Sequence, residues 1–239
     1  MTLRGKYALV TGGSRGIGRG IALKLGESGA KVAVHYYQKE DQAKATLEKL
    51  RACGSDGFVL QADVCKPEEI RRMIARVKSE FGALDIFVNN ARPEVATFYE
   101  GPMTIRLDMF DFAIKSQAKA FLVGVQEAVP MLRDRGRIIA MTYAPGGRFG
   151  SWQPWVAMGA AKAALEVLCR YFARHSGRPR KCRRAALLRG SQLDHGTNPG
   201  CGWRRLAHGC APPTGNPASA RGERRPRRLA GKPSKTRES

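Results

Sequence analysis

A glycine-rich turn near the amino end constrains the fold of this chain more than any other feature. The turn, Thr11-Gly-Gly-Ser-Arg-Gly-Ile-Gly18, follows an apolar run at 7–10 and opens a helical pattern over 18–25. Small residues let the backbone approach a diphosphate closely, and a helix N-terminus directs unpaired N–H groups towards it. The turn therefore predicts an α/β domain that binds a nucleotide.

Strand and helix patterns alternate through residue 173. Short apolar runs rich in β-branched residues predict strands at 7–10, 31–36, 57–61, 85–88 and 137–141. Amphipathic segments predict helices at about 17–28, 40–53, 67–81, 104–132 and 155–173. Strands separated by helices form parallel sheets, so we expect residues 1–173 to form a Rossmann-like, doubly wound parallel sheet.

The pattern stops near Arg174. Counted along the sequence, 17 of the 42 Lys and Arg residues but only 3 of the 20 Asp and Glu residues lie at 174–239. This composition buries too little apolar area to offset the entropy of ordering, so 176–239 is predicted to be a largely disordered basic tail. No strand is expected after 173, which leaves 137–141 at an open sheet edge. Out-of-frame translation of a GC-rich gene is one hypothesis for the abrupt change.

The basic tail raises two further functions. Clusters of Lys and Arg attract phosphates irrespective of sequence, so nonspecific polyanion binding is an alternative function. No recognition motif accompanies the clusters, and specific nucleic-acid binding is not expected. The tail also holds Cys182, His195, Cys201, His208 and Cys210, whose spacing does not match zinc fingers, so no metal is expected.

The location of the protein is predicted from what its sequence lacks. No apolar run reaches the length of a membrane span, and residues 1–6 carry no secretory signal pattern. We therefore expect a cytoplasmic protein that does not cross a membrane, with its six cysteines as reduced thiols.

Four motifs in register carry a resemblance to a known family. They are the glycine turn, Asp63-Val64 after the third predicted strand, Asn89-Asn90-Ala91 after the fourth, and Lys162-Ala-Ala-Leu-Glu166 in the last predicted helix. Over residues 1–173 the chain resembles the classical short-chain dehydrogenases/reductases, and within them the acyl-carrier-protein reductases of fatty-acid synthesis. The resemblance implies a nicotinamide nucleotide as cofactor.

Matched to that family, the cofactor-binding residues are Gly12, Ser14, Arg15, Gly16, Ile17, Gly18, His35, Tyr36, Asp63, Val64, Asn89, Ala91 and Lys162. NAD-dependent members place an Asp at the end of the second strand, where it binds the ribose 2′-OH. Here 35–39 contains no carboxylate, and Arg15 lies inside the glycine turn. Because Arg can bind a 2′-phosphate through paired N–H donors, we expect NADP(H) rather than NAD(H).

The catalytic positions depart from the family pattern. A tyrosine normally precedes the lysine by four residues and protonates the product oxygen, but Met158 stands there. Some enoyl reductases of the family place the tyrosine seven residues before the lysine, which here is Trp155. The proton-relay asparagine falls at Ser116, or at Gln117 in a register shifted by one.

The serine that orients the substrate in the family falls at Thr142 or Tyr143. The resemblance therefore implies catalytic roles for Lys162, Tyr143 and Ser116. Three interpretations of the reaction remain open. Tyr143 can supply the proton, since a phenol at a strand's carboxyl end reaches the ligand crevice. Water can instead protonate an enolate after enoyl reduction. In the third reading the chain binds nucleotide without turnover.

The expected substrate is a small or carrier-protein-linked acyl compound at the enoyl or 3-oxoacyl level. Arg92, at the position of a family glycine, could meet an anionic group on it. Five aromatic residues could line an acyl pocket: Phe98, Tyr99, Phe149, Trp152 and Trp155. Family members commonly form homo-oligomers, so an oligomer is also expected.

Overall fold

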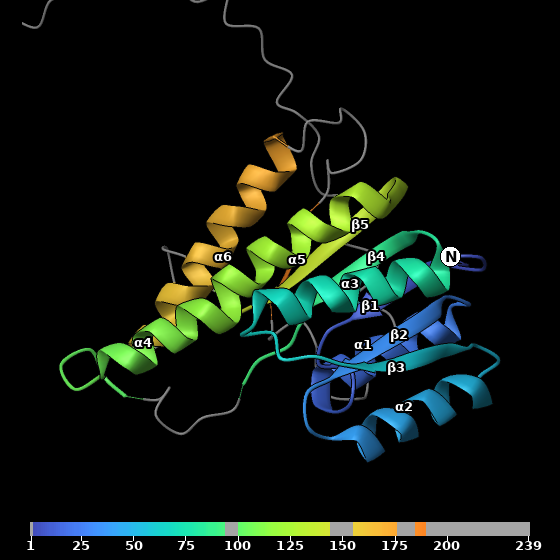
Figure 1. Cartoon of the computed structure of the whole chain (residues 1–239), viewed down its shortest axis with the longest axis horizontal. Helices are drawn as coiled ribbons and strands as arrows, with labels where there is room; N and C mark the ends of the chain where they lie inside the picture. The colour runs from blue at the N-terminus through green and yellow to red at the C-terminus, as the bar shows by residue number, and fades with distance from the viewer. Residues whose placement is uncertain (1, 94–99, 144–154, 176–184, 190–239) are drawn as a thin grey trace, which may run out of the picture.

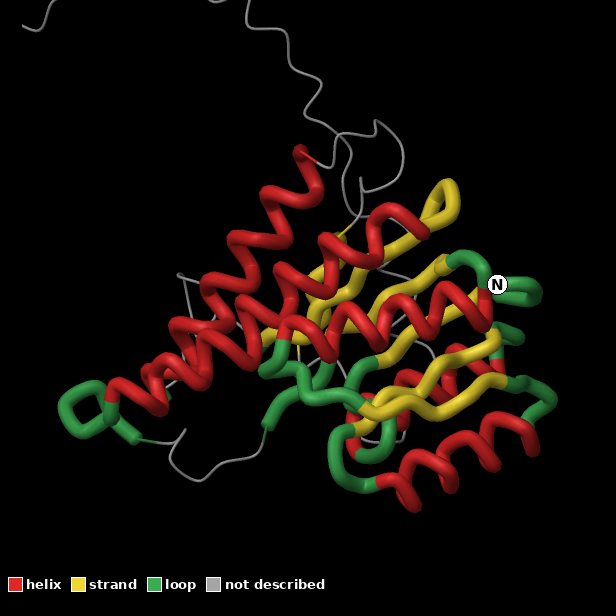
Figure 2. Tube along the Cα trace, in the orientation of Figure 1, coloured by secondary structure: helices red, strands yellow, loops and turns green. Residues whose placement is uncertain are grey.

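The fold is a parallel sheet between two layers of helices (Figure 1, Figure 2). The computed structural model describes residues 2–93, 100–143, 155–175 and 185–189, with side chains at all of these except 174, 175 and 185–189. In the described part of the chain the strands lie in the order β3-β2-β1-β4-β5-β6. Strands β1 to β3 extend the sheet towards one edge and strands β4 to β6 towards the other, and a crevice opens between the carboxyl ends of β1 and β4.

The strands are short except for β5, which has 11 residues. Their bounds are β1 Tyr7–Val10, β2 Lys31–Tyr36, β3 Gly57–Gln61, β4 Leu84–Asn89, β5 Leu132–Thr142 and β6 Ala185–Arg189. The helices are α1 Gly16–Glu27, α2 Glu40–Ala52, α3 Pro67–Phe81, α4 Leu107–Ile114, α5 Ala120–Ala128 and α6 Val156–His175. The prediction of a Rossmann-like parallel sheet is confirmed.

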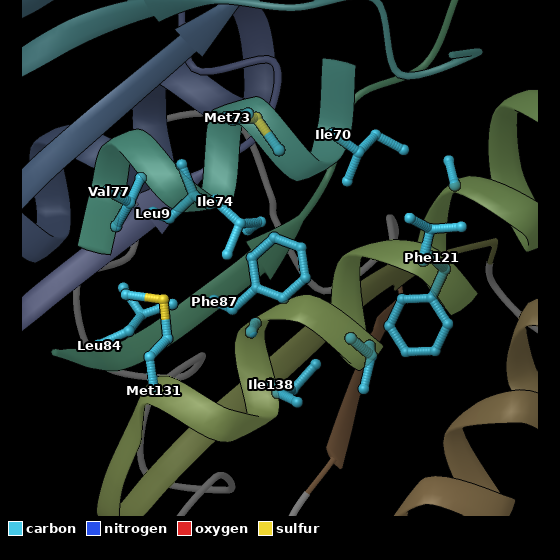
Figure 3. Packing of buried hydrophobic residues seen from close by; sticks show 14 of the residues in the cluster. Leu9, Ile70, Met73, Ile74, Val77, Leu84, Phe87, Phe121, Met131 and Ile138 are labelled. Atoms are coloured by element: carbon cyan, nitrogen blue, oxygen red, sulfur yellow. The ribbon is translucent and has the colours of Figure 1, made fainter. Parts of the chain in front are cut away.

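Two hydrophobic clusters fix which helices cover which face. Leu9 and Phe87 point to the face that α3, α5 and α6 cover, where Phe87 lies between Ile74 and Ile138 (Figure 3). Ala8, Val10, Ile86 and Val88 belong to the cluster with α1 and α2 on the opposite face. Successive strand residues thus face opposite helix layers, which is why the strands read as continuous apolar runs.

The amino ends of β1 and β4 are joined by a buried carboxylate. Asp85 is 4% exposed. It accepts hydrogen bonds from Lys6 Nζ at 2.9 Å, Tyr7 N at 3.0 Å and Arg133 Nη1 at 3.3 Å. The Arg133 guanidinium also lies over the Tyr7 ring, 4.8 Å from its centroid. This group lies at the end of the sheet away from the crevice.

The helix predicted at 104–132 is interrupted. α4 and α5 are joined by a π-helical turn, η2 (Lys115–Lys119), and a 3-10 turn, η3 (Val129–Met131), leads into β5. A π turn adds one residue to the helical repeat, so the residues after it face a different direction. This shift decides whether Ser116 or Gln117 faces the crevice.

The prediction that no strand follows residue 173 is wrong. β6 pairs in parallel with β5, from Ile138 opposite Ala185 to Thr142 opposite Arg189. β5 is therefore not the edge of the sheet. The run Ala185-Ala-Leu-Leu188 is apolar but neither alternates nor contains β-branched residues, so its pattern did not indicate a strand. Residues 176–184 and 190–239 lie outside the described part, and their predicted disorder stays a prediction.

Within residues 2–93, 100–143, 155–175 and 185–189, no helix combines the length and hydrophobicity needed to span a lipid bilayer.

Candidate functional site

A cavity of about 890 Å³ opens at the carboxyl ends of the strands. Most residues predicted to bind a cofactor line it, together with Tyr143: Gly12, Ser14, Arg15, Gly16, Ile17, Gly18, His35, Tyr36, Asp63, Val64, Ala91 and Lys162. Asn89 and Ser116 are not among the lining residues. The glycine turn and the α6 lysine, remote in sequence, therefore share one cavity.

The glycine turn is packed too tightly for side chains. Gly12 has a φ of +65°, which favours glycine. A Cβ on Gly18 would lie 2.1 Å from the Gly12 carbonyl oxygen, so the first turn of α1 sits directly on the glycine turn. These contacts explain why both positions carry glycine.

The N-terminus of α1 lies at the cavity, where Arg15 and Gly16 are among the lining residues. Its N-cap, Arg15, makes no side-chain capping bond, and its first turn contains no acidic residue. From the other side, Arg19 Nε donates to the Ser14 carbonyl at 2.9 Å and to Thr46 Oγ1 at 3.0 Å, which fixes the turn. Helix N–H groups and the helix dipole at such an end favour an anion. The glycine turn and the N-terminus of α1 together form a nucleotide cradle that fits a diphosphate.

His35 supports the turn from β2. Gly12 N–H donates to His35 Nδ1 at 2.9 Å, so Nε2 carries the ring proton and donates to the Ala62 carbonyl at 2.9 Å. Gly13 N–H donates to the His35 carbonyl at 2.9 Å. Burial lowers the pKa of His35 to about 4, which keeps the ring neutral. The sequence predicted a cofactor contact here but gave no signal for these internal bonds.

The cavity lining is strongly basic. Arg15, Lys39, Arg92 and Lys162 line it, and Asp63 is the one acidic residue among the described lining residues. Residues 35–39, at and directly after the end of β2, contain no carboxylate. This charge favours a ligand with several negative groups.

Asp63 is held in a turn after β3. Its Oδ1 accepts from Cys65 N at 2.8 Å, and its own N–H donates to Glu69 Oε2 at 2.7 Å. The carboxylate is thereby held at the cavity wall next to Val64.

Asn90, rather than Asn89, fastens β4 to the glycine turn. Asn90 Nδ2 donates to the carbonyls of Thr11 at 2.9 Å and Gly12 at 3.2 Å. Thr11 Oγ1 accepts from the N–H groups of Asn90 at 2.9 Å and Ala91 at 3.0 Å. Asn89 is the buried last residue of β4. The sequence motif identified the segment, but the structure assigns the bonding to its second Asn.

Lys162 is a buried lysine whose amine has two polar partners. The residue is 4% exposed. Its Nζ donates to Gln117 Oε1 and to the Met141 carbonyl, both at 2.7 Å. Burial, together with the nearby charge of Arg92, lowers the pKa of Lys162 to about 7. The amine therefore changes charge near neutral pH.

The π turn directs Gln117 towards Lys162. Gln117 is fully buried, and its Nε2 donates to the Ala91 carbonyl at 3.4 Å. Ser116 instead donates from Oγ to the Ala113 carbonyl one turn earlier, at 3.2 Å. The structure thus brings Gln117, the alternative register of the sequence reasoning, to the lysine, and not Ser116.

Three residues at or beside the predicted catalytic positions differ in their access to the cavity. Tyr143 and Trp155 line it, and their rings pack edge to face with centroids 6.2 Å apart. Met158 is fully buried in a cluster with Ala113 and Ala161. A phenol is therefore present at the end of β5, while the helix position four residues before Lys162 is apolar core.

The buried Glu166 anchors α6 to β5. Its Oε1 accepts from Thr142 Oγ1 at 2.8 Å. Its Oε2 lies 3.8 Å from Arg170 Nη2. These contacts hold the helix face that carries Lys162 against β5, directly before Tyr143.

Some predicted groups cannot be placed. Phe98, Tyr99, Phe149 and Trp152 of the predicted acyl pocket lie outside the described residues, as do the tail Cys and His residues. Among the residues that the structure does describe, no three His, Cys, Asp or Glu side chains gather as metal ligands.

The sequence matches one protein-family model and is similar to several known proteins. A family model described as enoyl-(acyl carrier protein) reductase matches residues 12–190. A 3-oxoacyl-[acyl-carrier-protein] reductase FabG of Staphylococcus epidermidis is 42% identical over 139 residues, which is 57% of this chain and 56% of that protein. The FabG of Staphylococcus aureus is 43% identical over 143 residues, covering 59% and 57%. The chain thus spans a little over half the length of these relatives.

Solved structures resemble the fold. A short-chain dehydrogenase from Burkholderia cenocepacia in complex with NADP has a TM-score of 0.68 and 36% identity, covering 76% of this chain and 72% of that one. The angucycline C-6 ketoreductase LanV with bound NADP has a TM-score of 0.66 and 37% identity, covering 74% and 69%.

Proposed function

This chain belongs to the short-chain dehydrogenase/reductase family, and from that premise we propose that it is an NADPH-dependent reductase of a thioester-linked acyl substrate. The observation that carries the proposal is one basic cavity lined by both the glycine turn and Lys162. The named FabG relatives favour the 3-oxoacyl level, and the description of the family model favours the enoyl level.

The cofactor proposal follows from the chemistry of the lining residues. The turn at Gly12 and the uncapped N-terminus of α1 suit the diphosphate of a dinucleotide. Arg15 and Lys39 suit a 2′-phosphate, because both are cations beside the end of β2. Asp63 and Val64 suit the adenine, as in the family. Neighbours solved with NADP support the choice of NADP(H).

The residues around Lys162 suit the reduction step. The bound nicotinamide would supply the hydride. Tyr143 is the proposed donor of the proton to the product oxygen, since a phenol can lose a proton and Met158 cannot. The Lys162 amine lies within the same cavity, and its charged form favours the phenolate left behind.

The setting of the reaction is part of the same proposal. We infer a carrier-protein-linked acyl substrate, a cytoplasmic location and a homo-oligomer, with a nucleotide-binding domain that extends through β6 to Arg189 and residues 190–239 as a basic tail. Light scattering of the purified chain measures the assembly state, and a monomer at working concentration would contradict the oligomer.

Calorimetry and turnover on the full chain test the function. We expect NADPH to bind and acetoacetyl or crotonyl thioesters to be reduced. Faster reduction of the acetoacetyl thioester would identify a 3-oxoacyl reductase, and faster reduction of the crotonyl thioester an enoyl reductase. No binding would contradict the whole proposal. Binding without reduction of either thioester would contradict the reductase and support the alternative of a nucleotide-binding protein without turnover.

The substitution Tyr143→Phe tests the proton donor. We expect kcat to fall by about 10²–10⁴-fold, the usual contribution of a general acid, with NADPH affinity unchanged. Tyr171→Phe is the matched control, because Tyr171 is exposed on α6. Turnover unchanged in Tyr143→Phe would leave water as the proton source for an enolate.

A further inference from the structure

Lys162 places a buried amine with two hydrogen-bond acceptors at the wall of the cavity. Its Nζ has two acceptors, Gln117 Oε1 and the Met141 carbonyl. A neutral amine has two N–H groups and one lone pair, so two acceptors can occupy both N–H groups and leave the lone pair directed elsewhere. Because the residue lines the cavity, a small molecule there can meet it.

No acidic side chain among the described residues bonds to the amine. Glu166, on the next turn of α6, is engaged by Thr142 and Arg170. The titratable groups that bear on Lys162 are the Arg92 cation after β4 and the Cys169 thiol on α6. Tyr143 lines the same cavity from the end of β5. Burial beside another cation is a known way to make a lysine nucleophilic at neutral pH.

We propose that Lys162 forms an imine with small oxo acids that enter the nucleotide-free cavity. In this step the Nζ lone pair forms a bond to the carbonyl carbon while the carbonyl π pair moves to oxygen. Proton transfer gives a carbinolamine, and loss of water leaves the carbon–nitrogen double bond. No oxidant or reductant is consumed. The activity does not depend on the proposed reductase reaction.

Arg92 selects the class of carbonyl compound. It lines the same cavity as Lys162, and its positive charge lowers the pKa of the Lys162 amine. A guanidinium favours a carboxylate on the incoming molecule. The site should therefore prefer acetoacetate to a neutral carbonyl of similar size, such as propionaldehyde.

Borohydride trapping on the full-length, nucleotide-free chain tests the proposal. The chain is incubated with acetoacetate, the imine is reduced to a stable secondary amine, and the modified lysines are mapped by mass spectrometry. We expect the Lys162 adduct to form with a midpoint near pH 7, as its pKa implies.

Lys44 provides the internal control, because its exposed amine is bonded to Glu40 and its pKa is raised. At pH 7 the fraction of neutral amine should be more than about a thousandfold higher for Lys162 than for Lys44. A midpoint above about pH 9 for Lys162, or adducts at Lys44 but none at Lys162, would overturn the proposal.

Arg92→Gln tests the selection of oxo acids. We expect a higher midpoint pH and a fall of about tenfold in the preference for acetoacetate over propionaldehyde, equivalent to one charged hydrogen bond. Arg71→Gln is the matched control, since Arg71 is exposed on α3 and pairs with Glu127. An Arg92 variant with unchanged preference would contradict the assigned substrate class.

Discussion

Lys162 and Gln117 are joined directly, from Nζ to Oε1 at 2.7 Å, although 45 residues separate them in the chain. The bond connects α6 to the π turn and depends on the residue that this turn rotates towards the cavity. It therefore ties the protonation of the lysine to the geometry of a helix interruption.

Two substitutions of Gln117 should shift the pKa of Lys162 in opposite directions. Gln117→Leu removes an acceptor that stabilises the ammonium, so the trapping midpoint should fall below that of the natural chain. Gln117→Glu adds a negative charge and should raise it. Gln117→Leu should also lower the free energy of unfolding by about 1–3 kcal/mol, because buried N–H groups lose a partner. Equal midpoints in all three proteins would contradict the direct bond.

The neutral His35 should make stability depend on pH. Its folded-state pKa of about 4 lies below the ordinary 6.5, so the unfolded chain takes up the proton first. This contribution is complete above about pH 6.5 and is lost as the pH falls towards 4, by about 3 kcal/mol in total. Urea unfolding between pH 4.5 and 7.5 measures the slope. His35→Asn should flatten it, and an equal slope in the variant would assign the pH dependence to other groups.

Gly18→Ala should disrupt the nucleotide cradle. Its Cβ would meet the Gly12 carbonyl at 2.1 Å, so the turn and α1 must separate. We expect a loss of about 3 kcal/mol in stability and weaker NADPH binding by calorimetry. Gly20→Ala on the same helix is the control, because its Cβ meets nothing within 4 Å. That control should gain about 0.5–1 kcal/mol.

Arg15→Gln should change nucleotide preference. Loss of a charged donor should weaken NADPH binding about tenfold to hundredfold while NADH binding stays nearly constant. Lys31→Gln is the control, since Lys31 lies at the opposite end of β2 and outside the cavity. A parallel loss for both nucleotides would show that Arg15 does not read the 2′-phosphate.

Asp85→Ala should be costly because it leaves Lys6 and Arg133 without their buried carboxylate. We expect a decrease of about 3 kcal/mol in the free energy of unfolding. Asp56→Ala is the comparison, as Asp56 pairs with Arg51 at an exposed position. It should cost less than about 1 kcal/mol. Denaturant unfolding measures both free energies. Similar losses in the two variants would contradict the proposal that the buried Asp85 carboxylate contributes more to stability than an exposed one.

The sequence located the parts of the site that depend on spacing and small residues. The glycine turn, Asp63 and Lys162 all line the cavity because strand ends in a parallel sheet meet at one edge. The choice between Ser116 and Gln117 could not be made, because a π turn shifts the helical period by one residue and leaves no compositional mark.

Two other features needed tertiary information. β6 could not be predicted from the sequence because its four apolar residues, between two arginines, show no alternation of apolar and polar residues. The strand is held by its pairing with β5. The bonds of His35 depend on the Gly12 N–H and the Ala62 carbonyl, whose approach is fixed only when the strands are side by side. Neither could be inferred from local propensity.

The two partners of the His35 ring both precede α3 in the chain, whereas Lys162 belongs to α6. During synthesis on the ribosome, the cradle for the diphosphate can therefore be completed well before the helix that carries the amine emerges. A nucleotide that bound at that stage would stabilise the partly formed sheet by mass action.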